Sequence, residues 1–225
     1  KVVETLTPPF IQRKNRERVI TVSSTISGTT IDKGVQALKA EINKMNIPDG
    51  VDTVITGSYE DQQESFSDLT TLLLIIIMLV YIVMASQFES LTYPFIIMFG
   101  LPFALSGVVL ALFMTGGTIN MMSMIGIIML VGIVVKNGIV LVDYINLNRE
   151  RGMGIIRAIV SGGRSRLRPV LMTTATTILG MIPLAVSSSQ GSEIWKPMAV
   201  TIIGGLTVST ILTLLVVPAI YKFMY

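Results

Sequence analysis

The sequence predicts a mainly α-helical, multi-pass membrane protein, with a bundle of five transmembrane helices preceded by a small α+β segment. Of its 225 residues, 51% are apolar, and the mean hydropathy of +0.71 exceeds that of an ordinary soluble domain. Most apolar residues gather in five stretches long enough to cross a hydrocarbon core ~30 Å thick. The first 57 residues differ, because they carry short β-branched runs and one amphipathic stripe.

The amino-terminal segment, residues 1–57, predicts a β-α-β arrangement. Residues 17–26 and 51–56 are rich in β-branched types and predict two strands. Between them, apolar residues at alternating spacings of four and three predict a helix over 31–45. A unit this small buries too little apolar surface to be stable alone. We therefore expect it to complete a sheet whose other strands lie outside this chain. The apolar stripe comprises Ile31, Val35, Leu38, Ile42 and Met45.

Residues 58–225 predict the membrane domain. The acidic stretch 58–68 predicts a helix that continues directly into the first span. Pro102 lies inside the second span, where neighbouring helices can satisfy the carbonyl group that a proline leaves free. Small residues, mainly glycine, recur along the spans and favour close helix packing. The five spans are expected near residues 69–86, 93–114, 121–146, 169–186 and 198–223.

Charge distribution predicts the orientation of these spans. The stretch 147–168 carries six arginines and one acidic residue, whereas the connections 115–120 and 187–197 carry almost no charge. By the positive-inside rule, 147–168 and the carboxyl terminus are cytoplasmic, and the amino-terminal segment is periplasmic or extracellular. A basic loop can instead bind anionic lipid or nucleic acid, but the topological interpretation is the commoner one. We expect a lipid bilayer around the protein and no nucleic-acid partner.

A charged pair, Lys136-Asn137, lies well inside the third span. At ~1.5 Å per residue, the lysine is roughly 15 Å from either end, farther than its side chain can reach. An ammonium group left in hydrocarbon costs at least ~2.5 kcal/mol. We therefore expect a partner carboxylate, a water-filled cavity or loss of the proton. The alternative is a structural lysine held by carbonyl or hydroxyl groups of neighbouring helices.

Three further polar residues are candidates for the same site. Asp143 follows Lys136 by seven residues, which is two turns along the same helix face. It can equally be an interfacial carboxylate paired with arginines of the 147–168 stretch. Arg166 and Thr173 are also seven residues apart and share a face if their helix is continuous. The threonine-rich run around Thr173 can equally serve helix packing.

The sequence gives little support for a catalytic or metal-binding function. The chain has no Cys and no His, which excludes disulfides and thiolate metal sites and removes the commonest general base. It contains no HExxH, GxSxG or phosphate-binding glycine-rich motif. The best soft-metal candidates, Met121, Met122 and Met124, are interpreted as core filler. We expect no enzyme activity, no cofactor and no bound metal. Because no ATP-binding motif is visible in the sequence, the energy for any transport would come from an ion gradient or from another chain.

Three motifs carry a resemblance to a known family. They are residues 132–143 (GIVVKNGIVLVD), 166–174 (RLRPVLMTT) and 179–184 (LGMIPL). Together they resemble the resistance-nodulation-division (RND) superfamily, and most closely the hydrophobe/amphiphile multidrug efflux pumps of Gram-negative bacteria. The resemblance covers nearly the whole chain. It implies a carboxyl-terminal part of such a subunit, namely a fragment of a periplasmic porter subdomain followed by the last five of twelve spans.

The resemblance also implies a function. Such pumps are homotrimeric drug/proton antiporters of the inner membrane, which export hydrophobic or amphiphilic compounds through a periplasmic adaptor protein and an outer-membrane channel. Lys136, within the Lys136-Asn137 pair, matches the family's relay lysine, and Arg166 and Thr173 match its relay arginine and threonine. Asp143 is a weaker candidate. The relay's acidic pair belongs to the amino-terminal half, which this sequence lacks, so the chain alone should not transport.

Other functions stay open. A heavy-metal exporter of the same superfamily is one alternative, although those relatives are expected to carry an acidic residue near the Lys136-Asn137 position. An accessory for protein or lipid export is another, and it would be expected to show different relay motifs. The third is a membrane scaffold that does not transport, in which Lys136 is a buried structural ion.

Overall fold

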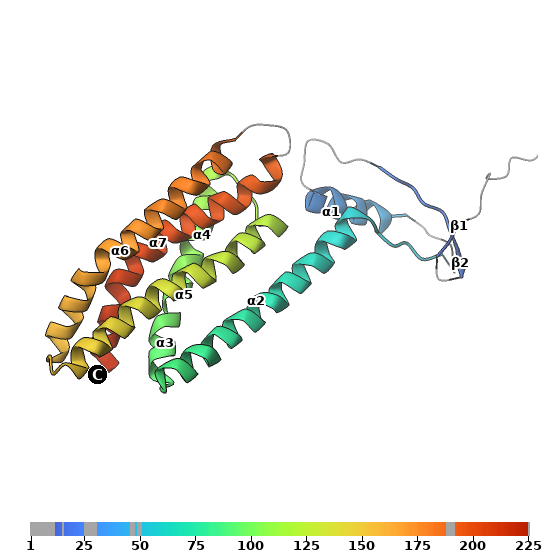
Figure 1. Cartoon of the computed structure of the whole chain (residues 1–225). Helices are drawn as coiled ribbons and strands as arrows, with labels where there is room; N and C mark the ends of the chain where they lie inside the picture. The colour runs from blue at the N-terminus through green and yellow to red at the C-terminus, as the bar shows by residue number, and fades with distance from the viewer. Residues whose placement is uncertain are drawn as a thin grey trace, which may run out of the picture. The chain divides into compact units, whose positions relative to one another are not determined.

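The computed structural model describes residues 12–14, 16–24, 31–45, 48, 51–187 and 192–224. The chain divides into two compact units, residues 1–60 and residues 61–225. The first unit contains a short hairpin and one helix, and the second contains the long helices (Figure 1). The two units are therefore considered separately.

In the first unit, the α+β character is confirmed but the predicted strand arrangement is wrong. Strands β1 (Gln12–Lys14) and β2 (Glu17–Val19) form an antiparallel pair, and helix α1 spans Ile31–Ile42. Residues 51–56 have no regular secondary structure. The predicted strand over 17–26 ends at Val19, and its residues 25–26 lie outside the described part of the chain.

The reason for this difference is visible in the exposure of the β-branched side chains. Ile20 is 92% exposed, Val22 88% and Val54 74%. A strand is stable where its backbone pairs with a neighbouring strand and one of its faces packs against other residues. The described residues offer these segments neither a pairing strand nor a packing surface. On α1, Val35 is buried, whereas Leu38 of the same predicted stripe is 46% exposed. The stripe thus has little to pack on within the described chain.

In the second unit, the five predicted spans are confirmed as five helical segments long and apolar enough to cross a membrane. The second span consists of two helices, α3 and α4, which are separated at Phe99. Pro102 explains the interruption, because it has no N–H group to donate to the carbonyl of Met98. The helices are α2 (Ser58–Phe88), α3 (Thr92–Met98), α4 (Gly100–Thr115), α5 (Met121–Glu150), α6 (Ile155–Val186) and α7 (Ser192–Met224).

The helices extend farther than the sequence predicts. The stretch 147–168 is not a loop, because α5 continues to Glu150, α6 begins at Ile155 and only residues 151–154 are non-helical. The fourth span therefore does not start at Pro169, which lies inside α6. Arginine is a good helix former, and a single proline removes only one backbone hydrogen bond from a long helix. α7 likewise begins before the predicted residue 198.

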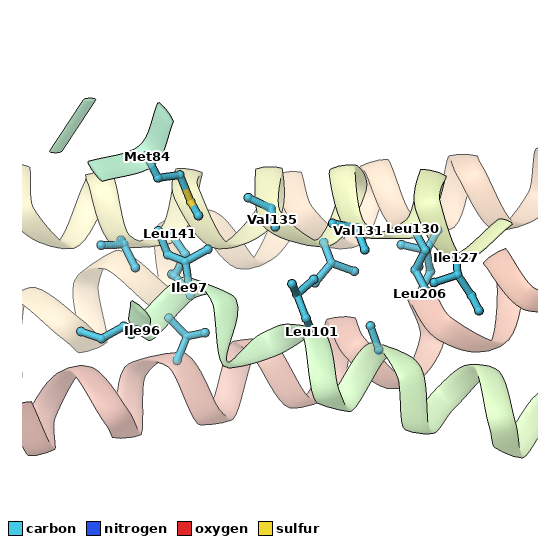
Figure 2. Packing of buried hydrophobic residues seen from close by; sticks show 14 of the residues in the cluster. Met84, Ile96, Ile97, Leu101, Ile127, Leu130, Val131, Val135, Leu141 and Leu206 are labelled. Carbon is cyan, nitrogen blue, oxygen red and sulfur yellow. The ribbon is translucent and has the colours of Figure 1, made fainter. Parts of the chain in front are cut away.

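The core of the second unit lies where α4, α5 and α7 pack against one another (Figure 2). Leu130, Leu141 and Leu206 are almost completely buried there. α6 packs on α5 and α7. From α2, Met84 is fully buried beside this core, but most of the helix is exposed. Of the three methionines at the start of α5, Met124 is buried in this core, whereas Met121 is 39% exposed.

Candidate functional site

The candidate site begins with one exposed stripe on α5. Lys136 and Asp143 are both exposed, although neighbouring positions such as Val135 and Val142 are buried. The exposed positions recur every three to seven residues, so they form one face of the helix. This stripe is the face of α5 that the described residues leave uncovered. Its members are Met129, Gly132, Lys136, Asp143 and Leu147.

Lys136 has no counter-charge in the described part of the chain. Neither Lys136 nor Asp143 forms an ion pair with any described residue. α5 is long and apolar enough to span a bilayer, and Lys136 sits at its middle. An ammonium group that faced lipid there would cost ~2.5–3.5 kcal/mol on insertion scales. The stripe on α5 therefore requires a polar cover that the described residues do not supply.

Arg166 of α6 lies against α5. Its guanidinium carbon is 4.5 Å from the centre of the Tyr144 ring, which is a cation–π contact. The Nε atom of Arg166 is buried and has no hydrogen-bond partner among the described residues. Tyr144 immediately follows Asp143 of the exposed stripe. The stacking thus places the side of α6 that carries Arg166 next to the α5 region that carries Asp143.

Thr173 lies two turns farther along α6 and is exposed. Its hydroxyl group donates to the carbonyl of Val170 at 3.0 Å, and the hydroxyl of Thr177 donates to the carbonyl of Thr173 at 2.9 Å. These bonds satisfy both hydroxyls within α6 itself. No hydrogen bond joins Thr173 to Lys136 among the described residues.

Asn137 lies on a different face from Lys136. Consecutive residues of an α-helix are turned by roughly 100°, and Asn137 lines a small cavity between α5, α6 and α7. The two residues of the predicted pair therefore have different surroundings: Lys136 lies on the open stripe, and Asn137 is half-buried beside the cavity. The cavity is lined by Val134, Asn137, Leu141, Val170, Ser209, Thr210, Thr213 and Leu214.

Hydroxyl residues of α7 form part of this interior, and the sequence reasoning did not identify them. Ser209, Thr210 and Thr213 are each at most 5% exposed. Thr210 shares a buried hydrogen bond of 3.1 Å with Thr174 of α6. The signal was present in the sequence, because spacings of one and four residues place three hydroxyls near one side of a helix. The result is a polar interface between α6 and α7.

A second polar network lies at the end of α5 that the charge rule assigns to the cytoplasm. Tyr221 of α7 is completely buried. Its hydroxyl donates to Oδ1 of Asn146 at 2.6 Å and accepts from a guanidinium N–H of Arg149 at 2.9 Å. Its ring stacks on Tyr93 at 6.0 Å between centroids. The network joins α3, α5 and α7, whereas the sequence indicated only a topological role for Arg149.

Comparison with known proteins decides the family. The model of the AcrB/AcrD/AcrF family matches residues 1–225. The chain belongs to this family of RND transporters. The resemblance carried by the three motifs is thereby confirmed, and the family is one of transporters rather than classical enzymes.

Individual relatives differ in their named roles. The chain is 37% identical to the swarming motility protein SwrC of Bacillus subtilis, over 100% of this chain and 21% of SwrC. It is 34% identical to the cobalt-zinc-cadmium resistance protein CzcA of Cupriavidus metallidurans, over 97% of this chain and 21% of CzcA. It is 33% identical to the multidrug resistance protein MdtC of Erwinia amylovora, over 96% and 21% respectively. Metal resistance and multidrug resistance proteins are thus both among its relatives.

Solved structures agree with the fold. A crystal structure of a heavy metal efflux pump matches with a TM-score of 0.77 and 31% sequence identity, over 88% of this chain and 20% of the pump. The chain therefore spans about a fifth of the length of the relatives and of the structure it matches.

Proposed function

We propose that this chain is the carboxyl-terminal membrane part of a proton-driven efflux transporter, a drug/proton antiporter that exports hydrophobic or amphiphilic compounds. The complete protein would be a homotrimer in the bacterial inner membrane, and it would work with a periplasmic adaptor protein and an outer-membrane channel. The amino-terminal segment would be periplasmic, and the α5–α6 connection and the carboxyl terminus cytoplasmic. Family membership supports this class of protein, and the arginines near the α5–α6 connection support the orientation.

The single observation that carries the proposal is the position of Lys136. It lies at mid-span on the uncovered stripe of α5, without an ionic partner in the described chain. A cation at this depth is by default a functional site. A carboxylate pair from the amino-terminal half of the transporter would cover the stripe and neutralise Lys136. The relay would then consist of that pair, Lys136, Arg166 and Thr173, with Asn137 and Asp143 beside it.

Coupling follows from electrostatics. When the carboxylate pair is ionised, it attracts the ammonium group of Lys136 across a medium of low dielectric constant. When the pair binds a proton, this attraction weakens and the lysine side chain can move away. The packing between α5 and the covering helix then changes, and the two arrangements differ in proton occupancy. Arg166, stacked on Tyr144, would transmit this change to α6.

The test is efflux of a fluorescent hydrophobic dye from cells that express the complete transporter, either unaltered or with Lys136→Ala. Met129→Ala is the matched control, because Met129 lies on the same exposed stripe but carries no charge. Lys136→Ala should assemble at normal abundance and fail to extrude the dye, whereas Met129→Ala should extrude it normally. Unchanged efflux in an assembled Lys136→Ala protein would contradict the relay.

A heavy-metal exporter is the second candidate, because CzcA is a cobalt-zinc-cadmium resistance protein by name and the matched crystal structure is that of a heavy metal efflux pump. Cells that express the complete protein would then survive elevated cobalt, zinc or cadmium, and Lys136→Ala would abolish this resistance. The unaltered protein would not extrude the dye. Drug export predicts the opposite pattern.

A scaffold that does not transport makes a third prediction. If Lys136 is a structural ion, Lys136→Met should be tolerated or even stabilising, because the uncompensated charge disappears. A relay should instead lose coupling while the protein still assembles.

A further inference from the structure

The cavity beside Asn137 is small, partly open and lined by residues of α5, α6 and α7. Its lining includes Asn137 of α5 and three hydroxyl residues of α7, Ser209, Thr210 and Thr213. The space open to a water-sized sphere is ≈ 10 Å³. One buried water needs about 10–15 Å³ measured in this way, together with two to four polar partners. The cavity thus matches a single water molecule in both size and lining.

One of the lining residues, Thr213, has an unsatisfied hydroxyl group. Thr213 is 5% exposed, and its Oγ1 atom is buried without a hydrogen-bond partner among the described residues. Buried polar groups in proteins almost always have a partner, either protein or water. Neighbouring hydroxyls are differently placed: Ser209 donates to the carbonyl of Leu206 at 3.3 Å, and Thr210 bonds to Thr174 at 3.1 Å. Thr213 is therefore the residue with most to gain from a ligand.

We propose that this cavity is a binding site for one structural water molecule, held by the Thr213 hydroxyl and the Asn137 side-chain amide. Thr213 donates to the water or accepts from it, and the amide supplies both a donor and an acceptor. The Ser209 hydroxyl retains free lone pairs and can accept a further bond. The inference rests on the cavity and its lining, and it does not depend on the substrate or on the proton relay.

The chemistry of the lining favours water over a metal cation. Its polar groups are three hydroxyls and one amide, and no carboxylate is among the lining residues. Hard cations require several oxygen ligands, usually with carboxylates among them, to replace their hydration shell. A neutral molecule that both donates and accepts matches this set better.

The water gives Asn137 a positioning role distinct from that of Lys136. It connects the inner face of α5 to the hydroxyl row of α7, while Lys136 occupies the uncovered stripe. A bridging water keeps much of the enthalpy of a direct hydrogen bond while tolerating a change in the separation of its partners. α5 can therefore shift slightly against α7 without leaving Asn137 or Thr213 unpaired.

The first experiment is a structure of the complete transporter in lipid nanodiscs, at a resolution that reveals ordered water. Density for one water within hydrogen-bond distance of Thr213 Oγ1 and the Asn137 amide is expected. A dry cavity would overturn the proposal. So would a direct Asn137–Thr213 hydrogen bond that closes the space.

The second experiment uses the sign of a stability change. Thr213→Val replaces the hydroxyl by a methyl group of similar size, and thermal unfolding of the solubilised transporter is measured. The matched control is Thr201→Val, also on α7. Thr201 is fully buried and its Oγ1 atom has no partner among the residues that the structure describes, but it does not line the cavity. Removing a hydroxyl that lacks a partner should raise the Tm, whereas removing one that holds water should not.

The expected result is therefore an increased Tm for Thr201→Val and an unchanged or decreased Tm for Thr213→Val. An equal increase in both variants would mean that Thr213 holds no water. A parallel comparison in sodium and choline salts addresses an ionic ligand. Stabilisation by sodium that disappears in Thr213→Val would identify a cation site and overturn the assignment to water.

Discussion

Helices α2 and α5 are similar in length and hydropathy, yet among the described residues only α5 of the two is packed in the interior. Their candidate spans each contain 30 residues, with mean hydropathies of 2.6 and 2.5. In the most apolar stretch of each, 6% of the α2 residues and 50% of the α5 residues are buried. Hydropathy therefore predicts that both helices cross the membrane, but it does not predict which of them lies within the bundle.

Small residues account for much of this difference. α5 contains Gly126 and Gly138 at positions where other helices pack closely, whereas α2 contains no glycine. A Cβ on Gly138 would lie 2.7 Å from Cγ2 of Ile97, so the absence of a side chain allows α3 to approach closely. Lipid tails are as apolar as leucine, so helix association in a membrane depends on such close packing. α2 instead presents leucine and isoleucine side chains, which suit lipid equally well.

The comparison is tested most strongly by shortening a leucine on each helix. Leu141→Ala on α5 removes a side chain that is 1% exposed, and it should lower the free energy of unfolding by about 2–5 kcal/mol. Leu74→Ala on α2, where the leucine is 63% exposed, should change it by less than ~0.5 kcal/mol. Thermal unfolding of the solubilised transporter measures both. Equal losses would mean that α2 is covered in the complete protein.

A pair of glycine substitutions sharpens the packing argument. A Cβ on Gly204 of α7 would collide with Cβ of Ala111 and lie 2.9 Å from the carbonyl of Gly107. Gly204→Ala should therefore destabilise the bundle by about 1–3 kcal/mol through overpacking. Gly180→Ala on α6, which has no atom within 4 Å of the new Cβ, should be neutral or slightly stabilising. A Gly204→Ala protein with an unchanged Tm would show that α4 and α7 can separate freely.

Two tyrosines extend the comparison to hydrogen bonds. Tyr221→Phe removes a buried hydroxyl that bonds to Asn146 and Arg149, and it should cost about 1–3 kcal/mol because those partners lose it. Tyr81→Phe on α2 removes a bond of 3.2 Å to the carbonyl of Leu91 in an exposed setting, and it should cost less. Comparing the Tm values of the two variants shows which hydroxyl group contributes more to stability. The reverse order would argue against the Tyr221 network as a clamp between α5 and α7.

The smallest expected effect concerns Arg166. Arg166→Lys keeps the charge but loses the planar guanidinium group that stacks on Tyr144, and the stability should fall by ~0.5–1 kcal/mol. Tyr144→Leu should cause a similar loss, and the double variant should lose little more, because both changes remove one contact. Additive losses in this double-mutant cycle would mean that the stacking does not contribute.

Much of the fold could be predicted from local sequence patterns. Five apolar stretches gave five spans, because the length and polarity of a membrane segment are properties of that segment alone. Secondary-structure limits were less predictable. Pro169 predicted the start of a span but lies inside α6. The β-branched residues 20–22 predicted a continuing strand, but β2 ends at Val19. Strand formation depends on neighbours that a local pattern does not reveal.

In the candidate site, too, some features could be predicted from local sequence and others depend on how the helices pack. The sequence by itself determined that Lys136 lies at membrane depth and that Asp143 follows on the same helix face, because both conclusions need only the helix repeat. Only the tertiary structure decided that this face is uncovered, that Asn137 lines a cavity with α7, and that Arg166 stacks on Tyr144. The physical reason is that helical periodicity orders residues around one axis, whereas the neighbour at each face is set by how helices from distant parts of the chain pack.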